Sequence, residues 1–169
     1  MEERVVIVDR DDQVIGDLPR SQVAPETYYR ISSLIVYNDK GEILLGKRAS
    51  TKAKNPDKWA PLVNGTNALG ETYESNIEKE AMEEIQFKLS EYWTVDTIRV
   101  EENFNYFVRY FATIITDTSM LVLDPNEISE MKWFTVQELE NELEANSDSF
   151  VPKFKEYILP IIKKGIPKA

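Results

Sequence analysis

The chain has 169 residues, of which 42% are apolar, which is enough for one globular domain with an ordinary buried core. Thirty acidic residues against twenty basic ones give a formal net charge of -10, which argues against a general affinity for nucleic-acid polymers or membrane surfaces. Because the chain has no Cys and no His, it has no thiol nucleophile and no imidazole base, and any metal ion must be held by oxygen.

The opening segment, MEERVVIVDRDD, carries acidic side chains where a secretory signal has a basic and then an apolar stretch. No apolar run elsewhere approaches the length needed to span a membrane. We therefore expect a cytoplasmic protein.

Two hairpins are expected in the N-terminal part of the chain. Residues 4–9 form a short strand, and residues 9–16 turn into a second strand. Residues 29–37 are rich in β-branched and aromatic side chains, residues 38–41 are typical of a type I turn, and residues 42–46 return as a strand.

Loops are expected to dominate the next segment. Residues 47–58 are polar, basic and proline-containing, which predicts a loop. Residues 59–63 can pair only as an edge or bulged strand because of Pro61, and residues 64–67 are expected to form a second loop.

The central helix is predicted to begin at Thr72, which with Ser75 suits N-terminal capping, and to run to about Gln86. The expected strands after it cover residues 92–100, 105–116 and 131–134. A capping box in residues 135–138 opens a helix that runs to Ala145, and residues 150–164 form a last amphipathic helix. Strands, one helix, more strands and then helices indicate an α+β domain with layers of helix and sheet.

Three glutamates crowd the end of the central helix. Glu80, Glu83 and Glu84 stand at i, i+3 and i+4, so they share one helical face, where each like-charge pair costs about 0.2–0.5 kcal/mol. They also lie at the negative end of the helix dipole. A solvated acidic surface is the usual meaning of such a run; the alternative is a site for a hard divalent cation, which would reverse the electrostatic cost.

The spacing around this cluster resembles the Nudix box, G-x5-E-x7-R-E-U-x-E-E-x-G-U, in which U is a bulky apolar residue. Gly65, Glu71 and the stretch KEAMEEIQF at residues 79–87 supply the fixed glycine and all four fixed glutamates. The resemblance implies a Nudix α/β/α sandwich with a mixed central sheet and a metal-binding helix at about residues 72–86. One domain would span residues 1–169, with a hairpin extension at 1–28, the Nudix core at 29–145 and a C-terminal helix at 146–169.

The resemblance also implies chemistry. In the family, box glutamates surround a divalent cation that bridges the phosphates of a diphosphate compound, while water attacks one phosphorus. Carried over, Glu80, Glu83 and Glu84 are expected to be catalytic metal ligands for Mg²⁺ or Mn²⁺. Glu71 is expected to act on the metal or its water.

A narrower resemblance covers the N-terminal half. Residues 8–12, Arg20, Arg48, Lys52 and Trp59 look like the branch that contains type I isopentenyl diphosphate isomerase and its hydrolase-like relatives. The three basic residues align with positions that hold a diphosphate in that branch, so we expect them to bind substrate, although residues 47–58 are also consistent with a solvated basic loop. Trp59 is expected to anchor the core or the loop rather than stack on substrate.

The isomerases of that branch carry a catalytic Cys just before the box glycine and a metal-binding His just after it. Here Asn64 and Thr66 stand at those positions. An amide cannot transfer a proton to or from an isoprenoid carbon as a thiol can, so the substitution argues against isomerase activity.

Three box positions differ from the pattern. Lys79 replaces an arginine that braces the box, Gln86 replaces a glycine that favours a positive φ, and Ala81 is smaller than usual. The first hypothesis is a metal-dependent hydrolase of a phosphoanhydride in a small nucleoside or isoprenoid diphosphate. The second is a Nudix-fold module that binds a phosphorylated ligand without turnover, which Lys79 and Gln86 favour.

The sequence leaves the substrate and the oligomeric state, monomer or homodimer, open. Phe104, Tyr106 and Phe107 are candidates either for the wall of a substrate pocket or for the core beneath a strand.

Overall fold

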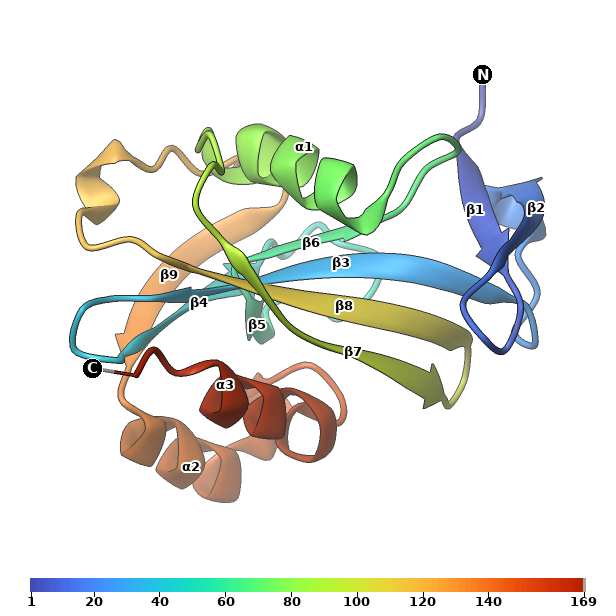
Figure 1. The fold of residues 1–169 in the computed structure, drawn as a ribbon. Helices are drawn as coiled ribbons and strands as arrows, with labels where there is room; N and C mark the ends of the chain where they lie inside the picture. The colour runs from blue at the N-terminus through green and yellow to red at the C-terminus, as the bar shows by residue number, and fades with distance from the viewer. Residues whose placement is uncertain (169) are drawn as a thin grey trace.

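The computed structural model describes residues 1–168 and has one mixed sheet between two helical layers. Figure 1 shows α1 (Tyr73–Ile85) on one face of the sheet and α2 (Val136–Ala145) with α3 (Leu159–Gly165) on the other. This arrangement confirms the α+β class and the sandwich with a mixed central sheet. Among residues 1–168, no helix is both long and apolar enough to cross a membrane.

The described part of the chain has nine strands in this sheet. They are β1 (Arg4–Val8), β2 (Val14–Pro19), β3 (Tyr28–Tyr37), β4 (Ile43–Arg48), β5 (Trp59–Pro61), β6 (Val63–Thr66), β7 (Trp93–Glu101), β8 (Asn105–Ile114) and β9 (Ile128–Phe134). Strand β3 is central: it pairs parallel with β8 from Tyr29↔Tyr106 to Tyr37↔Ile114, and antiparallel with β1, β4 and β6. The parallel pair between antiparallel neighbours makes the sheet mixed.

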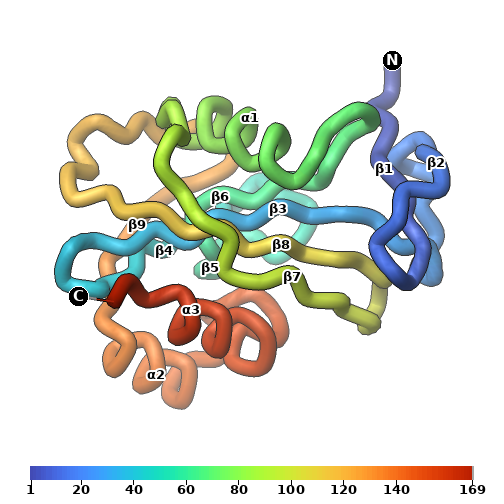
Figure 2. The backbone as a smooth tube through the Cα atoms, in the orientation of Figure 1, coloured from blue at the N-terminus to red at the C-terminus, as the bar shows by residue number. Residues whose placement is uncertain are grey.

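The N-terminal hairpin forms as expected and extends the sheet. Strand β1 pairs with β2 on one side and with the start of β3 on the other. It also holds the connection from β6 to α1, because Val6 N–H donates to the Asn67 carbonyl (3.1 Å) and Leu69 N–H to the Arg4 carbonyl (2.8 Å). Figure 2 shows this connection passing beside β1 before the chain enters α1. The hairpin therefore fixes the approach to the helix that carries the box glutamates.

Two apolar cores fill the two sides of the sheet. One lies under α1 and includes Leu34, Ile77 and Phe111, each with no exposed surface. The other lies under α2 and α3 and includes Tyr37 and Leu139. Trp59 belongs to the second core and meets the Phe134 ring edge-on at 5.6 Å, which confirms its role as a core anchor.

The prediction of a loop at residues 64–67 was wrong. Residues Val63–Thr66 form β6, which pairs antiparallel with β3 from Ile31↔Thr66 to Leu34↔Val63. The sequence pattern did not indicate this strand, because two polar residues and a glycine interrupt its apolar character. These residues are possible here because β6 lies beside the cavity described below rather than in a uniformly apolar environment.

The prediction of one helix over residues 150–164 was also wrong. The chain has a wide helical turn at Phe154–Ile158 that leads into α3 at Leu159–Gly165. Pro152 and the positive φ of Lys153 (62°) prevent an earlier start, and Phe150 instead bridges to Trp59. Pro160 lies in the first turn of α3, where the missing N–H has no helical partner to lose.

Helix α1 begins and ends as the sequence predicts. The Thr72 side chain accepts from Ser75 N–H, and the Ser75 hydroxyl oxygen accepts from Thr72 N–H at 2.9 Å. At the other end Gln86 is in the left-handed region (φ 50°, ψ 39°), the conformation that a glycine adopts at lower cost.

The Gln86→Gly variant should therefore be more stable than the wild type. We expect its free energy of unfolding to rise by about 0.5–1 kcal/mol, because glycine removes the steric cost of a positive φ. Urea denaturation measures this difference. Equal or lower stability would mean that the side chain contributes more than the backbone conformation costs.

Candidate active site

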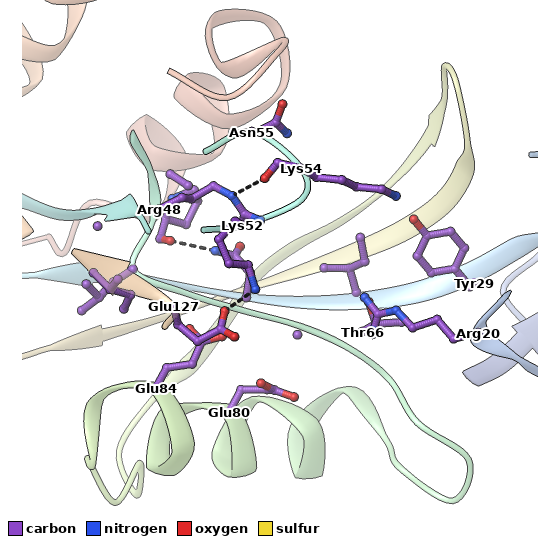
Figure 3. Close-up of a pocket in the computed structure, with 18 of the residues that line it drawn as sticks. Arg20, Tyr29, Arg48, Lys52, Lys54, Asn55, Thr66, Glu80, Glu84 and Glu127 are labelled. Carbon is purple, nitrogen blue, oxygen red and sulfur yellow. Dashed lines mark hydrogen bonds and ion pairs between the residues drawn. The ribbon is translucent and has the colours of Figure 1, made fainter. Parts of the chain in front are cut away.

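One cavity of about 330 Å³ lies between α1 and the sheet. Its size is within the range of small-molecule sites. Eight charged residues line it: Glu3, Arg20, Arg48, Lys52, Lys54, Glu80, Glu84 and Glu127. Figure 3 shows Glu80 and Glu84 extending from α1 into the cavity, with Arg48 and Lys52 on the opposite side. Carboxylates and cations therefore face each other across one space.

The three clustered glutamates of α1 are not equivalent. Glu80 and Glu84, one helical turn apart, line the cavity. Glu83 is exposed and lies outside the lining of this cavity in the described part of the chain. It is still close enough for its negative charge to raise the pKa of Glu80.

Gly65 on β6 makes room for the Glu80 side chain. A β-carbon at Gly65 would lie 2.5 Å from Glu80 Cδ and 2.7 Å from Oε1, closer than real contacts permit. The fixed glycine of the motif thus lets the carboxylate lie directly against the strand backbone. Asn76 Nδ2 also approaches Glu80 Oε1 (3.4 Å).

Lys79 braces two of the box glutamates despite replacing arginine. Its Nζ lies 2.6 Å from Glu71 Oε1 and 3.5 Å from Glu80 Oε1. Burial alone would lower the pKa of Lys79, but its contacts with Glu71 and Glu80 raise it, so the lysine stays charged.

Glu71 has its hydrogen bonds satisfied within the protein. It accepts from Ala68 N–H and from Asn76 Nδ2, both at 2.8 Å, and pairs with Lys79. Burial alone would raise the pKa of Glu71, but these donors outweigh it and hold the pKa below its ordinary value. It supports the loop before α1 and does not line the cavity among the described residues.

The two lining glutamates of α1 are hard to ionise. Burial raises the pKa of Glu84 to about 9, with the negative charges of Glu80 and Glu127 adding to the effect. Burial likewise raises the pKa of Glu80 to about 7; Lys79 opposes this shift and Glu83 adds to it. These carboxylates lack enough positive charge from the protein, which is the condition that a bound cation would relieve.

Glu127 is another lining carboxylate, contributed by the segment before β9. Its Oε2 pairs with Lys52 Nζ at 2.6 Å. The segment is held against the end of α1, because Asp124 N–H donates to the Glu84 carbonyl at 2.8 Å. This contact explains why residues 43 positions apart in sequence reach the same cavity.

The three predicted substrate-binding residues come together in the cavity from different segments. Arg48 ends β4, and its Nε donates to the Lys54 carbonyl at 3.1 Å, which shapes the basic loop. Lys52 lies in that loop, while Arg20 comes from the turn after β2 and pairs with Glu3 at 3.0 Å.

Sequence reasoning gave no role to Glu127 or Lys54, which also line the cavity. Of the three candidate aromatics, Phe107 is buried in the core under α1 and Tyr106 packs against the opposite core. Phe104 instead lines a second cavity.

Comparison with known proteins identifies the family. Residues 28–154 match the model of the NUDIX domain. The chain belongs to the Nudix family. It is 28% identical to a protein of Methanosarcina mazei described as a prenyl-diphosphate phosphatase, over 95% of this chain and 96% of that protein.

Two further comparisons cover most of the chain. An isopentenyl-diphosphate Delta-isomerase of Enterobacter sp. is 25% identical over 90% of this chain and 87% of its own. A crystal structure from Deinococcus radiodurans superimposes with a TM-score of 0.81 at 22% identity, covering 96% of this chain and 98% of the other, which supports the Nudix fold.

The donors in the cavity fit a hard cation. Glu80, Glu84 and Glu127 offer carboxylate oxygens, which Mg²⁺ and Mn²⁺ prefer. Within residues 1–168, however, no group of three or more acidic side chains has the geometry of a formed metal site. The residue types suit the divalent cation of Nudix hydrolases, and the carboxylates would have to move closer to one another to coordinate it.

Replacing Lys79 with Met should impair this Nudix site without unfolding it. We expect kcat/KM to fall by about tenfold, because Glu80 and Glu71 lose the ammonium group of Lys79, which orients them. The Lys79→Arg variant, which keeps the charge, should retain activity. Steady-state kinetics of the wild type, Lys79→Met and Lys79→Arg would test this role. Equal activity in all three proteins would show that the charge of Lys79 is not needed to orient the glutamates.

Proposed function

We propose that this Nudix protein hydrolyses a phosphoanhydride bond in a small organic diphosphate, with Mg²⁺ or Mn²⁺ as cofactor. The observation that carries the proposal is that Glu80, Glu84 and Glu127 line the same cavity as Arg20, Arg48 and Lys52. Carboxylates suit the cation that accompanies a diphosphate, and the basic residues suit the diphosphate itself.

In the proposed site each group has a distinct task. Glu80, Glu84 and Glu127 would hold the cation, with Glu83 joining from the exposed edge of α1 and Glu71 orienting Lys79 and Asn76. When bound, the cation would supply charge neutralisation and Lewis-acid polarisation of the phosphate. Arg48 and Arg20 would bind phosphate oxygens, and a lining carboxylate would accept the proton of the attacking water.

An isoprenoid diphosphate is the substrate class that we favour. The relative described as a prenyl-diphosphate phosphatase covers almost the whole chain. Isomerase activity is disfavoured, because the Asn64 side chain accepts from the Ser33 hydroxyl (2.7 Å) and donates to the Pro61 carbonyl (2.8 Å), so its amide is already engaged. The chain also has no Cys or His to supply a proton.

The departures that favoured a non-catalytic module carry less weight in the folded protein. Lys79 still reaches both glutamates, and Gln86 adopts the left-handed conformation expected of glycine. Neither change displaces Glu80 or Glu84 from the cavity.

Phosphate release from a substrate panel tests the proposal. The panel contains isoprenyl diphosphates, nucleoside di- and triphosphates, nucleotide sugars and dinucleotides, each with Mg²⁺, with Mn²⁺ and with EDTA. We expect metal-dependent turnover that the Glu84→Gln variant lacks. Silence across the panel, with a diphosphate analogue still bound, would favour the module that binds without turnover.

Arg48 should contribute mainly to substrate binding. The Arg48→Ala variant is expected to raise KM by about tenfold with a smaller change in kcat, because it removes a phosphate contact made before and during reaction. Arg99→Ala is the matched control, since Arg99 is exposed and lines neither cavity in the described part of the chain. Unchanged KM in Arg48→Ala would leave Arg48 as a loop residue only.

A further inference from the structure

A second cavity, of about 260 Å³, adjoins the first. The two share four lining residues: Arg20, Tyr29, Lys54 and Thr66. We call the second cavity the annex; its remaining lining residues are Val5, Ser21, Val23 and Phe104. Because Arg20 and Lys54 border both spaces, a molecule whose phosphates lie in the first cavity can extend into the annex.

The annex has the chemistry of a site for an apolar group. Val5, Val23, Phe104 and the ring of Tyr29 supply apolar surface from β1, the segment before β3, the turn between β7 and β8, and β3. The other four lining residues, Arg20, Ser21, Lys54 and Thr66, are polar. Among the described residues that line it, none has a carboxylate or amide side chain. Carboxylate and amide side chains pair well with the donors and acceptors at the edge of a nucleobase, whereas an alkyl chain needs only contact area.

Lys54 marks the boundary between the two chemistries. Its Nζ lies 4.6 Å from the centre of the Phe104 ring, within the range of a cation–π contact. Figure 3 shows the Lys54 side chain extending toward Tyr29, with Thr66 and Arg20 lower in this view. Its ammonium group therefore covers one face of Phe104, and because Lys54 lines both cavities it can also contact a phosphate in the first one.

We propose that the annex binds the hydrocarbon tail of the substrate, and that Val23 and Phe104 determine which tail lengths fit. The inference deepens the proposed function and rests on it for the placement of the diphosphate. Val23 and Phe104 are both partly exposed, so changes there alter the annex without opening either core.

Binding of non-hydrolysable analogues tests the annex separately from catalysis. Calorimetry with Mg²⁺ would compare methylenediphosphonate, which has no tail, with its five-carbon and ten-carbon prenyl esters and with α,β-methylene-ADP. We expect the five-carbon tail to strengthen binding about tenfold over methylenediphosphonate, because it buries several methylene groups. The adenosine group should add less than the prenyl tail; an equal or greater gain would overturn the assignment to hydrocarbon.

Two variants locate the effect. Val23→Phe should remove the gain from either tail by filling the annex, while the affinity for methylenediphosphonate and the unfolding temperature stay unchanged. Val122→Phe is the matched control, since Val122 is exposed and lines neither cavity among the described residues. Phe104→Ala should raise the affinity for the ten-carbon ester relative to the five-carbon one.

The outcomes separate the annex from the hydrolase. Tail-dependent binding that Val23→Phe removes would support the annex even if no diphosphate is hydrolysed, in which case only the proposed activity fails. Hydrolysis with no tail-dependent gain in the wild type, or equal losses in Val23→Phe and Val122→Phe, would overturn the annex and leave the activity standing.

Discussion

The Glu84→Gln variant is expected to lose turnover by about a thousandfold or more and, without metal, to be more stable than the wild type. Glu84 is only 7% exposed, and burial with the charges of Glu80 and Glu127 raises its pKa to about 9 from an ordinary value of 4.5. Folding of the wild type above pH 4.5 therefore requires Glu84 to take up a proton or to remain buried as a charge, whereas an amide is neutral at every pH and keeps the shape. The same substitution removes a carboxylate from the proposed cation site.

The sign of the pH dependence follows from this raised pKa. The unfolded chain releases the Glu84 proton near pH 4.5 and the folded chain near pH 9, so the unfolded state binds fewer protons between these values. The contribution of Glu84 to stability is thus complete below pH 4.5 and is lost as the pH rises toward 9. In EDTA at pH 8, Glu84→Gln should gain about 2 kcal/mol in free energy of unfolding, and less at pH 5.

Urea denaturation at both pH values measures this effect. Glu83→Gln is the matched stability control, because Glu83 is its exposed neighbour on α1 and should change stability by less than about 0.5 kcal/mol. Added Mg²⁺ should stabilise the wild type more than Glu84→Gln. A variant that is less stable than the wild type at both pH values would show that the carboxylate is satisfied within the protein.

The Gly65→Ala variant should lose about a hundredfold or more in kcat/KM with a smaller loss of stability. The added β-carbon would lie 2.5 Å from Glu80 Cδ, so the carboxylate must leave its place against β6. Because the side chain of Glu80 is flexible, the fold can adapt with a cost of about 1–2 kcal/mol. Activity and stability should therefore separate.

Gly16→Ala is the matched control for this substitution. Gly16 also lies in a strand, and apart from its two chain neighbours a β-carbon there would meet no atom of residues 1–168 within 4 Å. It should leave kcat/KM unchanged. If Gly65→Ala kept wild-type activity, the close packing of Glu80 against β6 would not matter for function.

The sequence predicted the elements whose signals are local. Thr72, Ser75 and the glutamate spacing determined α1, and the turn at residues 38–41 determined the hairpin of β3 and β4. Strand β6 was missed because its polar residues and glycine face the cavity. The C-terminal helix was misplaced because its apolar period continues through Pro152, whose effect on the backbone the period does not show.

The residues of the candidate site were likewise predicted only in part. Motif spacing indicated Glu80 and Glu84, and a family resemblance indicated Arg20, Arg48 and Lys52, all of which line one cavity. These residues come together because β3 pairs with β4 on one side and with β1 of the N-terminal hairpin on the other. Glu127 and the annex could not be read from the sequence, because each depends on contacts between segments far apart in the chain.

The most direct test of the account is a ³¹P NMR time course of the wild type in ¹⁸O-labelled water, with isoprenyl diphosphates first and then the rest of the panel. We predict that, with Mg²⁺ or Mn²⁺, the protein converts a diphosphate into a monophosphate and orthophosphate, with ¹⁸O in one product. EDTA and Glu84→Gln should each stop the reaction, and Glu78→Gln, on the same helix, should not. If no diphosphate in the panel is converted with either metal while methylenediphosphonate still binds, the protein is a binding module and the account is wrong.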